Sequence, residues 1–239
     1  MARQAFRWIP GILAMTMLAS VARAEASGTR ADTAFVQPAD FDFKTILTPP
    51  PTPDSDQGRQ EIDQLLKLQD QRTPKDEKRI AAETKLTPFL FSEVLGPWFN
   101  PDDLPTSAVF LANVMKESGA VCSAAKEVFH RDRPFRVDPR IKPCVEKEKT
   151  YSYPSSHSLR SMVLALTLSE IFPDQKDALI ARAKLVGDDR ALAGQHFPSD
   201  VAAGRILAKA IFQKMMQNPD FQTQLERAKD ECLAKEKAK

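Results

Sequence analysis

Residues 153–172 read YPSSHSLRSMVLALTLSEIF, and this stretch decides the fold class. Its apolar side chains recur at helical intervals, which predicts a strongly apolar helix from about Ser156 to Phe172. The apolar positions that indicate this helix are Leu159, Met162, Val163, Leu166 and Ile171. Glycine is scarce, at 8 residues, while Ala, Leu, Lys, Glu and Gln are plentiful, so the composition also favours helix over sheet.

The segments on both sides of this stretch are also predicted to be helical. The helical pattern begins at Gly58, and Ile62 and Leu65 share one face. Further helices are expected over about 75–84, 87–95, 105–118, 119–131, 174–193, 199–217 with Ser199 as N-cap, and from about Pro219 onward. Residues 135–153 are expected to form a loop. Because no repeats and no convincing alternating strands occur, the 239-residue chain is predicted to be all-α, a single-domain helical bundle.

Residues 1–24 are predicted to be a secretory signal peptide. Two arginines give a positive start, and a mostly apolar run over 8–21 precedes small residues at the positions that a signal peptidase reads. Cleavage is expected after Ala24, with Ala26 as the other candidate. A membrane anchor is the rival interpretation, but the run is shorter than the roughly 20 residues that span a bilayer. The mature protein is therefore expected to be soluble, and periplasmic or secreted.

Residues 25–57 are predicted to form an extended, proline-rich N-terminal arm, and residues 58–239 the helical domain. The run TPPPTP over 48–53 excludes regular helix. Loss of residues 1–24 would remove three arginines and no acid, which lowers the formal net charge of +2 by three, to −1. The charge balance therefore gives no argument for binding nucleic acid.

Three cysteines, Cys122, Cys144 and Cys232, raise the question of a disulfide. An exported protein meets an oxidising compartment, where a bridge can persist. Cys122 and Cys144 flank a basic block, so a bridge between them would pin that block. This pairing is the favoured interpretation and leaves Cys232 unpaired. The alternative is three free thiols, one of them buried.

The basic block reads KEVFHRDRP over residues 126–134. Lys126 and Arg133 are seven positions apart, about two helical turns, so both are predicted to project from one helix face. Two such cations could bind one phosphate, Arg through two parallel hydrogen bonds from its guanidinium and Lys as a point charge. The alternative is an exposed basic helix end. His130 of this block is expected to be structural.

A second block is PSSH, at the start of the apolar helix. The backbone N–H groups at a helix start are unpaired and form a ready site for an anion. Ser155 and Ser156 add hydroxyl donors, and His157 in the first turn is expected to face the bound group. An ordinary serine-capped helix is the alternative.

A third block reads GDDRALAGQHFPSD over residues 187–200. Arg190 is expected at the end of one helix, His196 in the turn that follows, and Asp200 in the first turn of the next helix. A carboxylate four residues from a histidine can accept its Nδ1 proton, which leaves Nε2 free to attack. A capping aspartate and a turn histidine are the alternative.

Together the three blocks resemble the signature of the type 2 phosphatidic acid phosphatase superfamily, K-x6-RP, then PSGH, then SR-x5-H-x3-D. Nine of the eleven identities are present between residues 126 and 200, and all fixed spacings hold. The signal peptide, the proline-rich arm and the length make the chain most similar to the bacterial class A non-specific acid phosphatases. The implied fold is the helical bundle of acid phosphatases and vanadium haloperoxidases.

The resemblance implies a division of labour for phosphate monoester hydrolysis. His196, oriented by Asp200, would attack phosphorus and form a phosphohistidine, while His157 would protonate the leaving alcohol and then activate water. The implied phosphate-binding residues are Lys126, Arg133, Ser155, Ser156 and Arg190. No metal and no cofactor is implied. An acidic optimum is expected, because His157 must be protonated while His196 stays neutral.

Two positions depart from the signature. Ser156 stands where the superfamily has Gly, which restricts φ and adds a side chain near the phosphate. Asp189 stands where it has Ser and places an acid beside Arg190, which could orient the guanidinium or repel a dianion. Neither change removes a predicted catalytic identity.

Three other functions compete with a soluble phosphatase that acts on small phosphate esters. A vanadate-dependent haloperoxidase would use a similar pocket, although the chain is short for that family. A phosphate-binding protein without turnover is the second, and a lipid-phosphate phosphatase is the third. No nucleic acid and no stable membrane insertion after signal cleavage are expected, and a homo-oligomer is left open.

Overall fold

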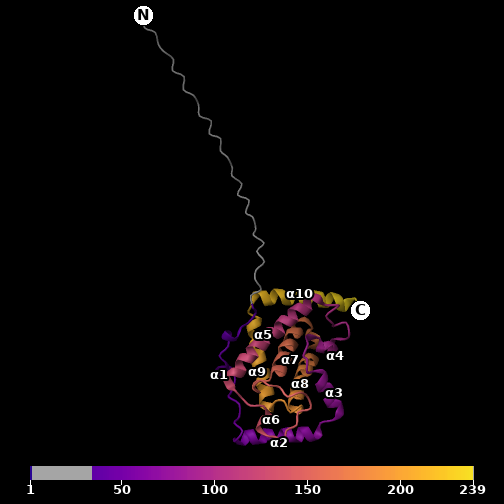
Figure 1. Ribbon diagram of the computed structural model, residues 1–239. Helices are drawn as coiled ribbons and strands as arrows, with labels where there is room; N and C mark the ends of the chain where they lie inside the picture. Colours follow the sequence, from indigo (N-terminus) through magenta and orange to yellow (C-terminus); the bar gives the residue numbers. More distant parts are fainter. Residues whose placement is uncertain (2–33, 239) are drawn as a thin grey trace. The chain divides into compact units, whose positions relative to one another are not determined.

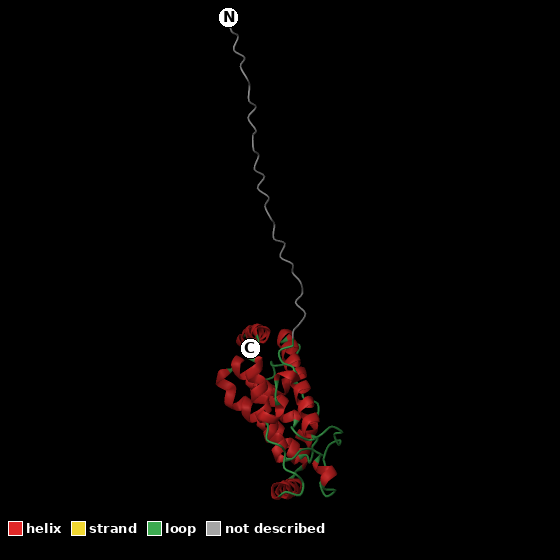
Figure 2. Cartoon of the chain, turned by 90° about the vertical axis from the view of Figure 1, so that its left-hand side faces the viewer, coloured by secondary structure: helices red, strands yellow, loops and turns green. Residues whose placement is uncertain are grey.

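The computed structural model describes Met1 and residues 34–238, and these residues form helices joined by loops, without a strand among them (Figures 1 and 2). The predicted all-α class is confirmed for this part of the chain. The predicted signal peptide beyond Met1, and the arm as far as residue 33, lie outside the described residues. The helices are η1 (Pro38–Asp40), α1 (Phe43–Ile46), α2 (Asp56–Gln71), α3 (Pro74–Ala82), η2 (Pro88–Phe91), α4 (Ser92–Leu95), α5 (Pro105–Phe129), α6 (Pro134–Val137), α7 (Ser156–Ile171), η3 (Pro173–Gln175), α8 (Lys176–Leu192), α9 (Pro198–Met215) and α10 (Pro219–Lys237).

Helix α7, the apolar helix, is the centre of the bundle. It packs against α5, α8 and α9, and also contacts α10. Apolar residues occur around most of its circumference, as expected for a helix with neighbours on several sides. Leu159, Val163, Leu164 and Leu168 are fully buried in the main core. Burial of such side chains contributes roughly 1.5–3 kcal/mol each, so this helix holds the bundle together.

Helices α10 and α2 cross opposite ends of the bundle (Figures 1 and 2). At the α10 end, the Glu231 carboxylate accepts hydrogen bonds from the backbone N–H groups of Thr106 and Ser107, at the start of α5. At the α2 end, Glu61 reaches α9 and accepts a hydrogen bond from Ser199 N at 2.7 Å. The turn after α5, the loop before α7 and the α8–α9 turn, which carry the three sequence blocks, are at this second end.

Helix α5 differs from the prediction of two helices over 105–118 and 119–131. It is one continuous helix that passes through Gly119, where a Cβ would lie 2.7 Å from the Arg160 guanidinium. The Arg160 guanidinium lies in the space beside Gly119, and the packing of the helix overrides the weak helix propensity of glycine. The helix ends at Phe129 because His130 adopts a left-handed conformation with φ 48°.

The start of α9 and the loop before α7 also differ from the predictions. Ser199 is not the N-cap of α9, because the helix begins at Pro198 and Phe197 caps it, with its N–H donated to the Asp200 carboxylate. Proline suits the first helical position because its missing N–H would be unpaired there anyway. The predicted loop 135–153 contains the end of the one-turn helix α6.

The described part of the proline-rich arm, from residue 34, is not extended throughout. It contains η1 and α1, and α2 begins at Asp56, inside the predicted arm. Its contacts with the bundle include Tyr153 Oη donating to Thr48 O at 2.6 Å and Val36 N donating to Glu117 at 3.1 Å. The arm therefore lies against α5 and the loop before α7.

Candidate active site

The three sequence blocks meet at the α2 end of the bundle. Lys126 is in the last turn of α5, Arg133 caps α6, and His157 is in the first turn of α7. Arg190 is in the last turn of α8, and the α8–α9 turn carries His196. Three cations, Lys126, Arg133 and Arg190, and a second histidine therefore lie around His196.

Two glycines allow this convergence. Gly194 has φ +72°, which lets the chain turn sharply after α8 and return toward α9. Gly204 of α9 faces the start of α7, where an added Cβ would lie 2.7 Å from Ser155 O. Larger residues at these positions would strain the turn or separate α9 from α7.

His196 is fully buried, and its two ring nitrogens have different partners. Nε2 lies 2.9 Å from Arg133 Nη1, and Nδ1 lies 3.3 Å from Asp200 Oδ2. A guanidinium can only donate, so Nε2 must accept and the ring proton must be on Nδ1. Burial, with the positive charges of Arg133 and Lys126, lowers the pKa of His196 well below its usual value. The ring is thus neutral, with the Nε2 lone pair toward the cations.

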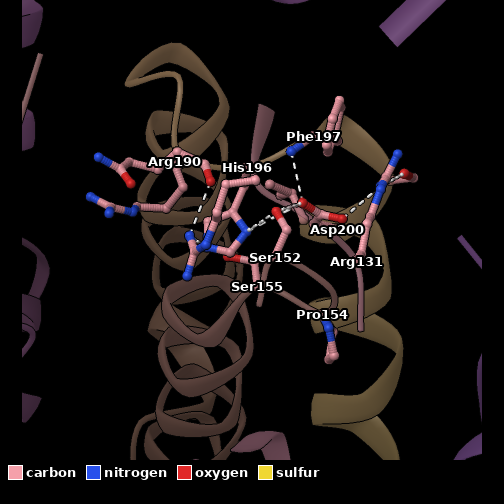
Figure 3. Close-up of polar contacts among 12 residues, drawn as sticks. Arg131, Ser152, Pro154, Ser155, Arg190, His196, Phe197 and Asp200 are labelled. Atoms are coloured by element: carbon pink, nitrogen blue, oxygen red, sulfur yellow. Dashed lines mark hydrogen bonds and ion pairs between the residues drawn. The ribbon is translucent and has the colours of Figure 1, made fainter. Parts of the chain in front are cut away.

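Asp200 is fully buried and is held by four donors (Figure 3). Its Oδ2 accepts from Phe197 N at 2.8 Å and from Ser152 Oγ at 2.5 Å, besides its contact with His196. Its Oδ1 accepts from Arg131 Nη1 at 2.6 Å. A carboxylate with this many donors is fixed in position, so it fixes the orientation of the histidine ring.

Glu148 lies between the two arginines of the site. Its carboxylate accepts hydrogen bonds from Arg133 Nη2 and, at 2.7 Å, from Arg190 Nη2. Burial alone would raise the pKa of Glu148, but the positive charges of Arg133 and Arg190 outweigh burial and hold that pKa well below its usual range. Glu148 is therefore an ionised carboxylate inside a cation cluster.

His157 and Lys126 complete the cluster. His157 Nδ1 is 4.0 Å from the Glu148 carboxylate, and Nε2 is 3.4 Å from Thr84 O. Burial, together with the positive charge of Arg190, lowers the pKa of His157 to about 4. Lys126 Nζ donates to the carbonyls of Tyr151 and Ser152, and burial lowers its pKa to about 8.

Residues 107–223 match the family described as the PAP2 superfamily, and this match spans all three blocks. The chain carries a PAP2 superfamily domain. The motif spacing predicted the same superfamily, so that prediction is confirmed.

Curated relatives of the PAP2 domain are bacterial acid phosphatases. The chain is 37% identical over 147 residues to "Non-specific acid phosphatase" of Providencia stuartii and 35% identical over 147 residues to the protein of that name from Salmonella typhi. Each match covers 59% of this chain and 59% of the relative. An "Acid phosphatase" of Zymomonas mobilis is 32% identical over 133 residues, which covers 54% of this chain and 50% of that protein. The matches span less than two thirds of the relatives' length.

Two solved structures share the fold. A transmembrane PAP2 type phosphatidylglycerolphosphate phosphatase from Bacillus subtilis has a TM-score of 0.50 at 21% identity, covering 69% of this chain and 87% of that one. A bacterial vanadium dependent iodoperoxidase has a TM-score of 0.57 at 17% identity, covering 78% of this chain and 54% of that one. They confirm the predicted fold class. In the part of this chain that the structure describes, no helix is long and apolar enough to cross a bilayer.

The two departures from the PAP2 signature have structural partners. Asp189 is buried and turns away from the cluster, accepting hydrogen bonds from Arg79 Nε at 2.6 Å and Nη2 at 2.7 Å. It therefore pairs with α3 instead of facing a phosphate. The Ser156 hydroxyl lies 3.3 Å from Cys122 Sγ, so it is held near α5.

The predicted bridge between Cys122 and Cys144 is absent from the structure, where all three cysteines are free thiols. Cys122 is buried on α5 beneath the start of α7, and its Sγ is 3.7 Å from Pro154 O. Cys144 is in the loop after α6, where its backbone N–H donates to Ala193 O. The basic block is positioned by hydrogen bonds of its arginines instead.

The premise that placed Lys126 and Arg133 on one helix face was wrong, although both side chains lie in the cluster. The helix ends at Phe129, and the chain turns through His130 before Arg133 caps α6. His130 is 56% exposed and its ring makes an edge-to-face contact with Tyr151, and its predicted structural role stays a prediction. Ser155 Oγ accepts from Ser158 N at 3.5 Å as the α7 cap, and its predicted contact with phosphate stays a prediction.

Four residues of the site had no signal in the sequence analysis: Glu61, Arg131, Ser152 and Glu148. Arg131 joins Asp200 to Glu61 of α2, at 2.6 and 2.7 Å, and stacks 3.8 Å from the Phe197 ring centroid. Of these four residues, Arg131 alone lies inside one of the three sequence blocks, KEVFHRDRP, which could have drawn attention to it. Among the residues that the structure describes, no group of three or more His, Cys, Asp or Glu side chains is arranged to hold a metal ion.

Proposed function

We propose that the chain is an exported acid phosphatase that hydrolyses phosphate monoesters through a phosphohistidine on His196 and needs no metal ion. The observation that carries the proposal is the neutral His196 ring, with its Nε2 lone pair 2.9 Å from Arg133 inside a cluster of cations. The relatives named acid phosphatase support the reaction class. The predicted signal peptide supports export.

In the first step, the phosphoryl group takes the place beside Nε2 that Arg133 now faces. The Nε2 lone pair forms the N–P bond, and the P–O bond to the leaving group breaks with its electron pair on oxygen. That oxygen takes a proton from His157. Asp200 accepts the hydrogen bond from Nδ1–H and stabilises the positive charge that develops on the His196 ring.

In the second step, water attacks the phosphohistidine. Neutral His157 takes a proton from the water, the new P–O bond forms, and the N–P bond breaks with its electron pair returned to Nε2. His157 Nδ1 faces the cluster at 4.0 Å from Glu148, while Nε2 lies near Thr84 O, and these contacts support Nδ1 as the atom that exchanges this proton. Inorganic phosphate then leaves.

Lys126, Arg133 and Arg190 supply the charge stabilisation. Phosphoryl transfer needs positive charge around the equatorial oxygens more than covalent assistance, and preorganised cations in a buried site provide it. Arg190 Nε and Nη1 are buried with no hydrogen-bond partner, so they are available for phosphoryl oxygens. The same cations could hold vanadate, which keeps the haloperoxidase reaction as the rival.

Hydrolysis of p-nitrophenyl phosphate with EDTA present tests the proposal directly. Because the pKa of His157 in the free protein is lowered to about 4, the fraction that carries a proton falls as the pH rises above that value. We therefore expect kcat/KM to be highest in acid and to decline as the pH rises above about 4. A bound dianion would raise the pKa of His157, which moves the decline of kcat to higher pH than that of kcat/KM.

The outcomes of this assay separate the alternatives. Loss of activity in EDTA that added metal restores would contradict metal independence. Halide oxidation with vanadate and peroxide, without ester hydrolysis, would favour the haloperoxidase. Preference for phosphatidic acid in vesicles would favour a lipid-phosphate phosphatase, and phosphate binding without turnover a binding protein. Recovery of activity from the periplasm or medium, with residues 1–24 removed, tests export.

A further inference from the structure

The loop between α6 and α7 places a carboxylate where the proposed function needs a phosphoryl group. Glu148 accepts hydrogen bonds from Arg133 and Arg190, and its Oε1 is 4.0 Å from His157 Nδ1. Arg133 and Arg190 are the proposed phosphoryl ligands, and His157 is the proposed proton donor. One acidic side chain therefore contacts the same residues that would bind and protonate the substrate.

The surrounding loop holds this carboxylate in position. Glu148 N donates to Gln195 Oε1 at 3.3 Å, and Gln195 Nε2 donates to the carbonyls of Val145 and Glu146 at 3.3 and 2.9 Å. Gln195 is buried and directly precedes His196. The turn that carries the proposed nucleophile thus fastens the loop that carries Glu148.

The cluster offers more donors than one carboxylate can use. The Glu148 carboxylate has two oxygens and one negative charge, whereas a phosphate monoester has three terminal oxygens and up to two charges. Arg190 is 2% exposed, yet its Nε and Nη1 have no hydrogen-bond partner. A buried donor left unpaired is destabilising, so a larger anion would satisfy the Arg190 groups that Glu148 leaves without a partner.

The exposure of the three side chains indicates which of them can move. The Arg133 and Arg190 side chains are 0% and 2% exposed, whereas that of Glu148 is 30% exposed. Glu148 therefore enters the cluster from the solvent side. Rotation of its side chain toward solvent would vacate the site without displacing the helices that hold the arginines.

We infer that Glu148 is a resident competitor for the phosphate site, which every phosphate ester and every product phosphate must displace. The role in turnover rests on the proposed function, but the effect on phosphate binding does not. Displacement breaks two charge-assisted hydrogen bonds and leaves a negative charge near the mouth of the site. Glu148 therefore weakens affinity for substrate and for inorganic phosphate together, and limits inhibition by the product.

Replacement of Glu148 by glutamine tests this role, because the amide has nearly the same shape and no charge. Binding of inorganic phosphate is measured by calorimetry with EDTA present. We expect Glu148→Gln to lower Kd at least about 10-fold, which corresponds to about 1.4 kcal/mol. The KM for p-nitrophenyl phosphate should fall by a similar factor, while kcat changes by less than about threefold, because the competitor acts on ground-state binding.

Glu146→Gln is the matched control. Glu146 is exposed on the same loop, two residues away, so its replacement removes the same charge without emptying the cluster. We expect phosphate binding within about twofold of the unmodified protein, as for a screened surface charge. An equal gain in Glu146→Gln would show that net loop charge sets the affinity, and would overturn the inference.

An unchanged or weaker phosphate affinity in Glu148→Gln would also overturn it. If this variant does not fold, Glu148→Ser carries the same expectation, and failure of both to fold would show that the carboxylate is a structural element instead. If Glu148→Gln binds phosphate more tightly but neither it nor the unmodified protein hydrolyses the ester, the proposed function is rejected and the inference stands. If both hydrolyse the ester normally and phosphate affinity is unchanged, the inference is rejected and the proposed function stands.

Discussion

Replacement of His196 by alanine is expected to lower kcat/KM for p-nitrophenyl phosphate by at least about 10⁴-fold, because it removes the nucleophile. The structure supports this size of effect. His196 is the histidine whose Nε2 lone pair is directed at the cation cluster, and its Nδ1 is held by Asp200. Its ring is therefore the group that this variant removes from beside Arg133.

His130→Ala is the control for this variant. His130 is exposed and lies outside the cluster, so its replacement should leave hydrolysis within about threefold of the unmodified protein. Calorimetric binding of inorganic phosphate to His196→Ala shows whether the cation cluster survives. Near-normal hydrolysis by His196→Ala would reject the assignment of the nucleophile.

Replacement of Asp200 by asparagine is expected to lower kcat by about 10²- to 10⁴-fold and to destabilise the fold. Asp200 accepts from four donors, whereas an amide has one oxygen and one NH₂ group. If the amide oxygen faces Phe197 N, Ser152 and His196, the NH₂ faces the Arg131 guanidinium, and two donors meet. If the amide is reversed, the NH₂ meets the Nδ1 side of His196 and favours the wrong tautomer.

Glu61→Gln separates these two effects. Glu61 is also a buried carboxylate that pairs with Arg131, at 2.7 Å, but it does not contact His196. Glu61→Gln should therefore lower the free energy of unfolding, measured by urea denaturation, with a much smaller change in kcat. If both variants lost kcat equally, Asp200 would act through Arg131 and the general packing instead of through the histidine ring.

The fold was predictable from sequence wherever the signal was local. The apolar run over 156–172 predicted α7, and its burial on several sides follows from that composition. The boundary at residue 119 was not predictable, because glycine usually weakens a helix. There it makes room for Arg160, which lies on another helix.

The site was predictable to the extent that spacing encodes it. The order and spacing of the three blocks placed His157, His196 and Asp200 together, and the turn at Gly194 makes the short separation of His196 and Asp200 possible. The spacing of Lys126 and Arg133 led to a wrong helix. The left-handed residue His130, which separates them, has no local signature.

The partners of the site were not predictable because they come from distant segments. Arg131 reaches Glu61 of α2, 70 positions away, and Glu148 reaches Arg190, 42 positions away. Each is one of many charged residues in the sequence, and only the folded chain shows which of them are buried together. Glu148 in particular is an ordinary loop residue until its arginine partners are known.

The most direct test of the central claim is to trap the phosphoenzyme. The protein is mixed with an excess of p-nitrophenyl phosphate, quenched with base, and mapped by mass spectrometry of its peptides. A phosphorus–nitrogen bond survives base and is lost in acid, so we predict a base-stable, acid-labile phosphoryl group on His196, and none in His196→Ala. A phosphoryl group on another residue, or rapid hydrolysis with no phosphoryl-protein at any quench time, would contradict the account.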